Sequence, residues 1–182
     1  MPVDFYINEF ILAARVLQEK NMLNIGFGSI SLKTGTDTMI INKKDTCIKE
    51  ENFYIQVNIN NKTLAYKESN EDVDIHSKIY KEISYAKTIL NIFLPDIVAY
   101  SIMHQKFNPM DAHGRKYFNN IKIIEDYNNE KNLNKLLETL KKDEITIIKA
   151  QSIFIISRDI KEALKKAFIL NNSAKILLKI PH

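Results

Sequence analysis

Residues 69–94 read SNEDVDIHSKIYKEISYAKTILNIFL, and the character of this stretch changes twice along its length. It begins with polar residues that are typical of a loop. Apolar residues then recur at the spacing of one helical face, which predicts a helix over 73–85. The apolar run 88–94 is short and is closed by Pro95, as expected of a buried strand.

Similar patterns on both sides of this stretch predict the rest of the fold. Short turns rich in Gly, Asp and Asn indicate two hairpins, and 108–120 is expected to be a loop. Repeats, low-complexity tracts and linkers are absent from the sequence, so we expect one layered α/β domain over 1–182. The expected helices are 4–20, 96–107, 129–142 and 159–179, and the expected strands are 29–33, 38–41, 53–59, 63–66, 121–124, 145–149 and 153–156.

The composition argues against several classes of protein. Cys47 is the only cysteine among 182 residues, which excludes a disulfide framework or a cysteine-based metal cluster. Four glycines cannot build a dinucleotide or Walker loop. The sequence shows no signal peptide and no membrane-length apolar run, so a cytoplasmic location is expected. The net charge of +4 comes mainly from lysines, and the presence of only three arginines argues against nucleic acid as a partner.

Four stretches, taken in order, resemble the class II aldolase/adducin family. Residues 28–31 (GSIS) are similar to the family's Gly-Asn-x-Ser strand entry, and 39–42 to the strand before its phosphate-binding Thr-Pro-x-Gly turn. Residues 69–72 with the His-x-x-x-Tyr pattern of 76–80 look like its Ser-Ser-Glu loop and helix. Residues 145–164 are similar to its last strand, turn and helix. The resemblance implies a three-layer α/β/α sandwich around a central mixed, largely antiparallel sheet.

The resemblance also implies chemistry on a divalent metal, usually zinc, held by a His-x-His pair and a third histidine. Those positions fall on Asn91, Phe93 and Gln151, and a phenyl ring cannot bind a metal. We therefore expect no metal ligands at the family's positions. The family's acidic residue, which moves a proton, falls on Glu71 or Asp72, and the alignment does not choose between these two candidate catalytic residues.

A phosphate-binding surface is the other feature that the resemblance implies. The turn that would hold the phosphate lies at 42–45 and has neither the proline nor the glycine of the family's turn. Lys43 and Lys44 beside Lys33 predict either a basic lip for a phosphate or polyanion, or a solvated turn in a lysine-rich chain. The expected ligand-binding residues are Gly28, Ser29, Ser31, Asn42 and Lys43.

These substitutions favour a catalytically degenerate member of the family that has no cofactor. Such a protein would bind a small phosphorylated ligand in the old pocket or bind partners on its surface. It would assemble as a homo-oligomer, with the family's ring-like tetramers as the precedent. The alternative is an aldolase or epimerase acting on sugar phosphates with zinc or another divalent metal, its site rearranged around Glu71, Asp72, His76, His104 or His113. Polyanion binding through lysines is a third, weaker hypothesis.

Overall fold

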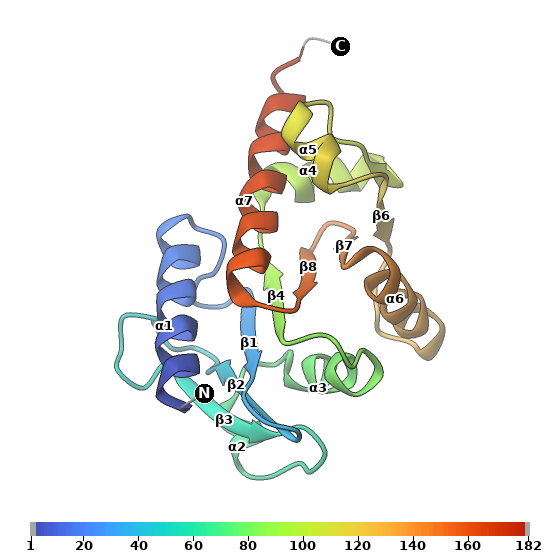
Figure 1. The fold of residues 1–182 in the computed structure, drawn as a ribbon. Helices are drawn as coiled ribbons and strands as arrows, with labels where there is room; N and C mark the ends of the chain where they lie inside the picture. The colour runs from blue at the N-terminus through green and yellow to red at the C-terminus, as the bar shows by residue number, and fades with distance from the viewer. Residues whose placement is uncertain (1–2, 181–182) are drawn as a thin grey trace.

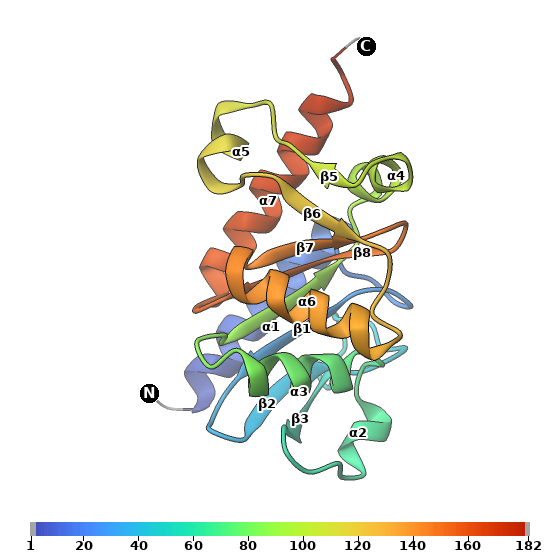
Figure 2. The ribbon, with the colours of Figure 1, turned by 90° about the vertical axis from the view of Figure 1, so that its right-hand side faces the viewer.

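A single eight-stranded sheet runs through the computed structural model, which describes residues 3–180. The strand order is β3-β2-β1-β4-β8-β7-β6-β5, and every neighbouring pair is antiparallel except β6 and β7 (Figure 1; β5 is labelled in Figure 2). The sheet is therefore mixed and largely antiparallel, as predicted. The strands are β1 (Ser29–Lys33), β2 (Thr38–Asn42), β3 (Tyr54–Asn58), β4 (Thr88–Ile92), β5 (Lys106–Phe107), β6 (Ile121–Ile124), β7 (Ile145–Ile148) and β8 (Ser152–Ser157).

Helices cover both faces of the sheet and complete the predicted three-layer α/β/α sandwich (Figure 2). The helices α1, α4 and α7 pack on one face, and α3 and α6 pack on the other. Within the described residues, no helix combines the length and the apolar composition that crossing a membrane requires. The helices are α1 (Val3–Glu19), α2 (Ala65–Glu68), α3 (Val73–Glu82), α4 (Pro95–Met103), α5 (Ala112–Tyr117), α6 (Glu130–Asp143) and α7 (Ile160–Leu177).

The central strands send alternate side chains into two separate cores. Ile30 of β1 and Leu90 of β4 pack on the face covered by α1 and α7. Ile89 of β4 packs on the opposite face, against α3. Burial of each such side chain contributes about 1.5–3 kcal/mol. Ser29 and Ser31 occupy the α3-facing positions of β1 and are fully buried, so this core contains a polar strip.

The predicted strand over 63–66 is wrong, because this segment enters the short helix α2 instead. Asn58 ends β3 by accepting hydrogen bonds from the backbone amides of Asn60 and Asn61 at 2.8 and 2.9 Å, which turns the chain away from the sheet. The Tyr66 hydroxyl then donates to the carbonyl oxygen of Asn58 at 2.9 Å, a contact that no local alternation of residues predicts. The strand β3 pairs with β2, not with a following strand.

The boundaries between 96 and 120 also differ from the prediction. The helix expected over 96–107 ends at Met103, and its last two expected residues form β5. The expected loop 108–120 contains α5, which Asp111 caps by accepting from the amide of Gly114 at 2.7 Å. The sequence does not predict this helix because it contains Gly114, and glycine has a low helix propensity. A Cβ on Gly114 would lie 2.4 Å from the Ser173 Oγ, so the close approach of α5 to α7 requires glycine.

The adjacent strands β1, β4 and β8 are antiparallel and of similar length, so one end of each strand lies at each of two opposite edges of the sheet. Ser29 at the start of β1 pairs with Asn91 near the end of β4, close to where β8 begins at Ser152. At the other edge β1 ends at Lys33, and β8 ends at Ser157. Each of these edges carries a pocket.

Candidate functional site

The first pocket opens at the edge where β1 begins and β4 ends. It is a cavity of about 310 Å³ whose walls come from loops far apart in the sequence. Its polar lining includes side chains of both charges. The lining residues are 23–28, 42–46, Ile48, 70–72, 91–93, Gln151 and Ser152.

The Asp72 carboxylate lies at the floor of this pocket and accepts hydrogen bonds from two neutral groups. Its Oδ2 accepts from the Ser29 hydroxyl at 2.6 Å and from the side-chain amide of Asn91 at 2.8 Å. The Tyr127 hydroxyl lies 3.4 Å from Oδ1, and burial together with the Asp72 charge raises the pKa of Tyr127 to about 12. Glu71 is exposed and makes no side-chain hydrogen bond within the described residues. The geometry therefore favours Asp72 as the acidic group of the site.

A buried chain of polar side chains leads away from Asp72 between β1 and α3. His76 and Tyr80 are four residues apart on α3, and Ser29 and Ser31 are two residues apart on β1. Four helical residues advance about 6 Å and two strand residues about 6.6 Å, so the two pairs lie in register. The His76 ring lies 2.9 Å from the Ser29 Oγ and 2.7 Å from the Ser31 Oγ, and Tyr80 lies 2.9 Å from Ser31.

The hydrogen bond to Asp72 sets the direction of this chain. Because Ser29 uses its only proton on the carboxylate, its oxygen accepts from Nε2–H of His76. The Nδ1 of a neutral ring then accepts from the Ser31 hydroxyl. Burial lowers the pKa of His76 to about 4, although the nearby Asp72 charge raises it. The pKa of Tyr80 is raised by burial, so both rings are uncharged at neutral pH.

The three positions where the family would hold a metal do not provide three metal ligands. Asn91 turns its amide nitrogen toward Asp72, and its Oδ1 is buried without a partner in the described residues. Phe93 packs on Phe27 with ring centroids 5.2 Å apart, and Gln151 is exposed. Within residues 3–180 no group of three His, Cys, Asp or Glu side chains could hold a metal ion. The polar groups nearest these positions are the Asp72 carboxylate and the side-chain amides of Asn91 and Gln151. They do not match the nitrogen and sulfur donors that zinc prefers.

The predicted phosphate-binding turn lines the opposite wall of the pocket. Asn42 accepts from the backbone amide of Ile30 at 2.9 Å, which ties the turn to β1. Asp45 has a φ of 53°, a left-handed conformation at the position where the family has glycine. Lys43 lies 3.8 Å from Glu68, and the exposed Lys44 also lines the cavity. The turn therefore keeps a left-handed residue without a glycine.

Of the predicted ligand-binding residues, Gly28, Asn42 and Lys43 line the pocket. Ser29 and Ser31 lie in the buried chain, and their role in ligand binding stays a prediction. The basic lip does not form as expected, because Lys33 lies at the far end of β1, among the residues of a second pocket.

Two histidines of the rearranged-site hypothesis lie elsewhere. His104 stacks on Tyr100 at the end of α4 with a centroid distance of 3.7 Å, and His113 is in α5. Neither residue lines the pocket. Sequence reasoning did not single out Tyr127 or Asn70. Asn70 donates to the carbonyl oxygen of Gly28 at 3.1 Å, and both residues sit in loops whose partners only the fold brings close.

Comparison with known proteins gives a consistent result. The sequence profile described as "Class II Aldolase and Adducin N-terminal domain" matches residues 8–178. A comparison with curated protein sequences finds no match.

Solved structures share the fold at low sequence identity. The L-fuculose-1-phosphate aldolase from Thermus thermophilus is 16% identical with a TM-score of 0.83, covering 94% of this chain and 91% of that one. YgbL from Klebsiella pneumoniae, a putative aldolase/epimerase/decarboxylase, is 12% identical with a TM-score of 0.82, covering 98% and 90%. A sugar-phosphate aldolase from Thermotoga maritima is 16% identical with a TM-score of 0.73, covering 96% and 95%. The family match over nearly the whole chain shows that this protein belongs to the class II aldolase/adducin family.

Proposed function

We propose that this protein is a catalytically degenerate member of its family that binds a small polar ligand without metal-dependent aldol chemistry. The observation that carries the proposal is the set of side chains at the family's metal positions. Phe93 has no donor atom and packs on Phe27, while the amide nitrogen of Asn91 is committed to Asp72. The Asp72 charge is thereby stabilised by neutral donors and does not need a cation.

The lining of the pocket supports a hydroxylated, anionic ligand. The Asn91 Oδ1 and the Ser152 Oγ are both buried, both belong to pocket-lining residues, and neither has a partner within the described residues. A buried polar atom without a partner costs roughly 1–3 kcal/mol, so a side-chain rotation that brings either oxygen to a ligand hydroxyl would be favourable. Lys43 and Lys44 lie on the opposite wall, where they would favour a phosphate. A short sugar phosphate combines both features.

Metal analysis tests the first part of the proposal. Freshly purified protein is expected to contain no stoichiometric zinc or manganese and to show no rise in melting temperature when either is added. The matched control is a variant with Asn91→His, Phe93→His and Gln151→His, which restores three imidazole donors and is expected to gain zinc. Stoichiometric zinc bound to the unmodified pocket would refute the proposal.

Calorimetry with a panel of short aldose and ketose phosphates tests the second part. Binding is expected without turnover, and Lys43→Gln with Lys44→Gln should weaken it. The paired change Lys141→Gln with Lys142→Gln on α6 alters the net charge equally, away from the pocket, and should have no effect. Turnover that disappears in Asp72→Asn would contradict degeneracy and support the alternative of an active lyase or epimerase.

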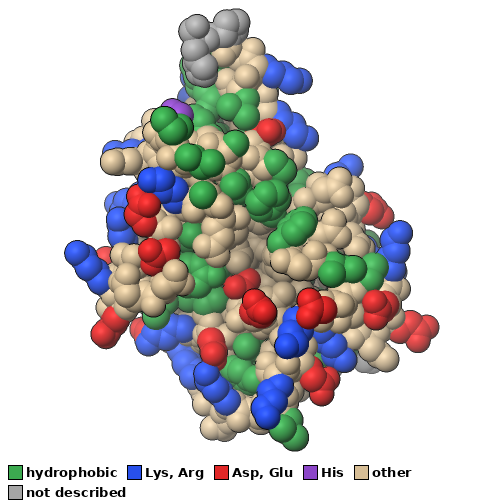
Figure 3. All heavy atoms as spheres, turned by 180° about the vertical axis from the view of Figure 1, so that it is seen from behind, with side chains coloured by type: hydrophobic (Ala, Val, Ile, Leu, Met, Phe, Trp, Pro, Cys, Tyr) green, Lys and Arg blue, Asp and Glu red, His purple; other side chains and the backbone are tan. Residues whose placement is uncertain are grey.

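We also propose that the chain assembles as a homo-oligomer. Large apolar side chains are exposed around α4 and the end of α7, and Figure 3 shows hydrophobic side chains gathered over the upper part of one face. Contiguous exposed apolar surface is typical of interfaces. Light scattering after size exclusion should give a mass above one chain, and Met103→Lys should reduce it. A monomer at all concentrations would exclude assembly.

A further inference from the structure

Tyr127 connects two walls of the first pocket. It belongs to the loop between β6 and α6, and its ring stands edge-on against Phe154 of β8, with ring centroids 5.6 Å apart. Its hydroxyl lies 3.4 Å from the Asp72 Oδ1 and 3.5 Å from the Gln151 Nε2. Asp72 and Gln151 both line the cavity, and Tyr127 lies behind them. The Tyr127 side chain therefore bridges two pocket-lining residues that come from different loops.

The buried Asn91 Oδ1, which has no partner within residues 3–180, lies among groups that contact Tyr127. Asn91 is the register partner of Phe154, so the two side chains share the face of the sheet that α3 and α6 cover. The amide nitrogen of Asn91 donates to Asp72 at 2.8 Å. Because Phe154 and Asp72 both contact Tyr127, Asn91 lies beside this tyrosine.

Ser152 provides a second such oxygen on the same side of the pocket. It directly follows Gln151, and it points to the same face of β8 as Phe154 because the two residues are two positions apart. The Ser152 Oγ is buried and has no partner in the described part of the chain. Asn91 and Ser152 line the pocket but are only 4% and 7% exposed, so their free oxygens lie behind its surface, on the Tyr127 side.

The contacts that hold the Tyr127 hydroxyl are long. A hydroxyl donor usually lies about 2.7–2.8 Å from its acceptor oxygen, and the Asp72 Oδ2 accepts from Ser29 and Asn91 at 2.6 and 2.8 Å. Burial and the Asp72 charge raise the pKa of Tyr127 to about 12, so its hydroxyl keeps its proton at neutral pH. A ligand hydroxyl at the usual distance would be a better donor to the Asp72 Oδ1 than Tyr127 is.

The free oxygens determine which chemical group can enter this region. The Asn91 Oδ1 can only accept a hydrogen bond and Asp72 carries a negative charge, so a phosphate or carboxylate oxygen would be repelled there. A ligand hydroxyl can donate to either acceptor, and it can accept from the Ser152 hydroxyl. The lysines of the phosphate-binding turn line the opposite wall. These charges therefore orient a ligand with its phosphate at the lysines and its hydroxyl end toward Tyr127.

We propose that Tyr127 covers an inner subsite of the first pocket that binds ligand hydroxyls, and that displacement of its side chain admits them. In the bound state, ligand hydroxyls donate to the Asp72 Oδ1 and the Asn91 Oδ1 and contact the Ser152 Oγ. Tyr127 is thereby the residue that determines specificity for hydroxylated ligands. The inference rests on the proposed function, because it concerns the same pocket, and it adds which end of the ligand enters and which side chain moves.

Two phosphate esters that differ only in their hydroxyls test the subsite. In calorimetry, glycerol 1-phosphate should bind at least about tenfold more tightly than n-propyl phosphate, because only glycerol 1-phosphate carries donors for the inner oxygens. Ser152→Ala removes an oxygen that has no partner among the described residues, so the melting temperature should not fall. The same variant should reduce the preference for glycerol 1-phosphate about three- to tenfold, which a merely structural role would not do.

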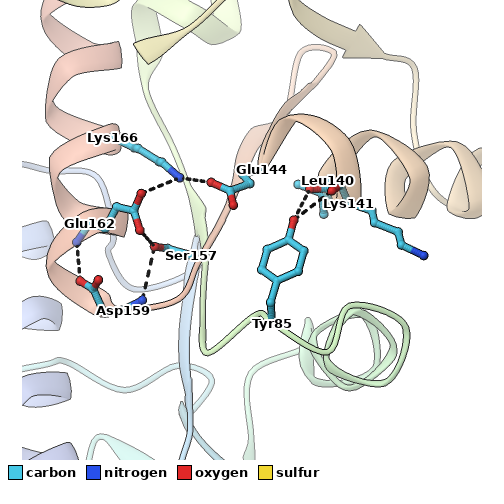
Figure 4. A network of polar contacts seen from close by, with 8 residues as sticks. All are labelled: Tyr85, Leu140, Lys141, Glu144, Ser157, Asp159, Glu162 and Lys166. Atoms are coloured by element: carbon cyan, nitrogen blue, oxygen red, sulfur yellow. Dashed lines mark hydrogen bonds and ion pairs between the residues drawn. The ribbon is translucent and has the colours of Figure 1, made fainter. Parts of the chain in front are cut away.

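Thr88→Val is the matched control for Ser152→Ala. The Thr88 Oγ1 is likewise buried without a partner in residues 3–180, but Thr88 begins β4, at the edge of the sheet far from the first pocket. Its register partner Ser157 donates to Glu162 at that edge (Figure 4). The control should therefore leave the affinities for both esters unchanged.

Labelling with 3-fluorotyrosine follows the moving side chain directly. The chain has eight tyrosines, and the variants Tyr127→Phe and Tyr117→Phe identify the two signals that the test needs. Glycerol 1-phosphate should shift the Tyr127 signal in a saturable manner and leave unchanged that of Tyr117, which lies in α5. The ester without hydroxyls, n-propyl phosphate, should leave both signals unchanged.

The results separate this inference from the proposed function. Equal affinities for the two esters, a Tyr127 signal that does not respond, or an unchanged preference in Ser152→Ala would overturn the inner subsite while leaving ligand binding by the pocket intact. If neither ester binds, the proposed function fails, and the inner subsite fails with it.

Discussion

Acid should destabilise this protein through one buried side chain, His76. The ring is fully buried between α3 and β1, and desolvation lowers its pKa to about 4. The unfolded chain has a histidine pKa of about 6.5. Between these two values the unfolded state binds more protons than the folded state, so stability falls as the pH falls through this window. His76→Gln removes the titrating group while keeping one donor and one acceptor for the two serines.

The size of the effect follows from the two pKa values. Between pH 7 and pH 5 the wild type should lose about 2 kcal/mol of unfolding free energy through His76, and about 3 kcal/mol below pH 4. Urea unfolding of both proteins at pH 7 and pH 5 measures the loss, and the difference between the two losses isolates His76 from all other titrating groups. Equal losses in both proteins would refute the reasoning. A selectively labelled histidine spectrum gives an independent check, because the His76 signal should not titrate above pH 5.

Three further changes test the packing and charge arguments by urea or thermal unfolding. Gly28→Ala should lower the free energy of unfolding by about 2–4 kcal/mol, because its φ is 84° and a Cβ there would lie 2.8 Å from a Leu23 methyl group. Gly26→Ala is the control: its φ is 82° but a Cβ would enter open space, so it should lower the free energy of unfolding by only about 1 kcal/mol. Equal costs would contradict the predicted clash. Lys166→Met removes the cation that pairs with both Glu144 and Glu162, and should lower the free energy of unfolding by about 2 kcal/mol. The loss is smaller than for a fully buried pair because both carboxylates are partly exposed, and an unchanged stability would contradict the argument. Asp159→Ala removes the cap of α7 and should cost about 1 kcal/mol, and no loss would mean that the cap is redundant.

The sequence predicts most elements of this fold because their burial is periodic. The helix α6 shows this well, since Leu136, Leu137 and Leu140 are buried at the spacing that predicted it. The errors have another origin. The segment at 63–66 has a strand-like composition. Its conformation depends on the turn that Asn58 forms and on the hydrogen bond from Tyr66 back to Asn58, which the local alternation of residues does not predict.

The candidate site was only partly predictable for the same reason. Spacing along the sequence placed the family's acid at Glu71 or Asp72, and only the fold shows which carboxylate meets Ser29 and Asn91. The grouping of Lys33 with Lys43 and Lys44 relied on nearness in sequence. A strand of five residues instead carries Lys33 to the opposite edge of the sheet.

The His-x-x-x-Tyr pattern also illustrates how far a motif can be separated from the chemistry with which it is associated. In this chain His76 and Tyr80 are buried, uncharged and hydrogen-bonded to Ser29 and Ser31, and neither lines the first pocket. Their role here is to satisfy two serines that would otherwise leave polar atoms unpaired in the core, at roughly 1–3 kcal/mol each. Such a role persists whatever occupies the metal positions, because it depends on the packing of α3 against β1. The pattern is therefore informative about the fold, whereas Asn91, Phe93 and Gln151 are the positions that bear on the reaction.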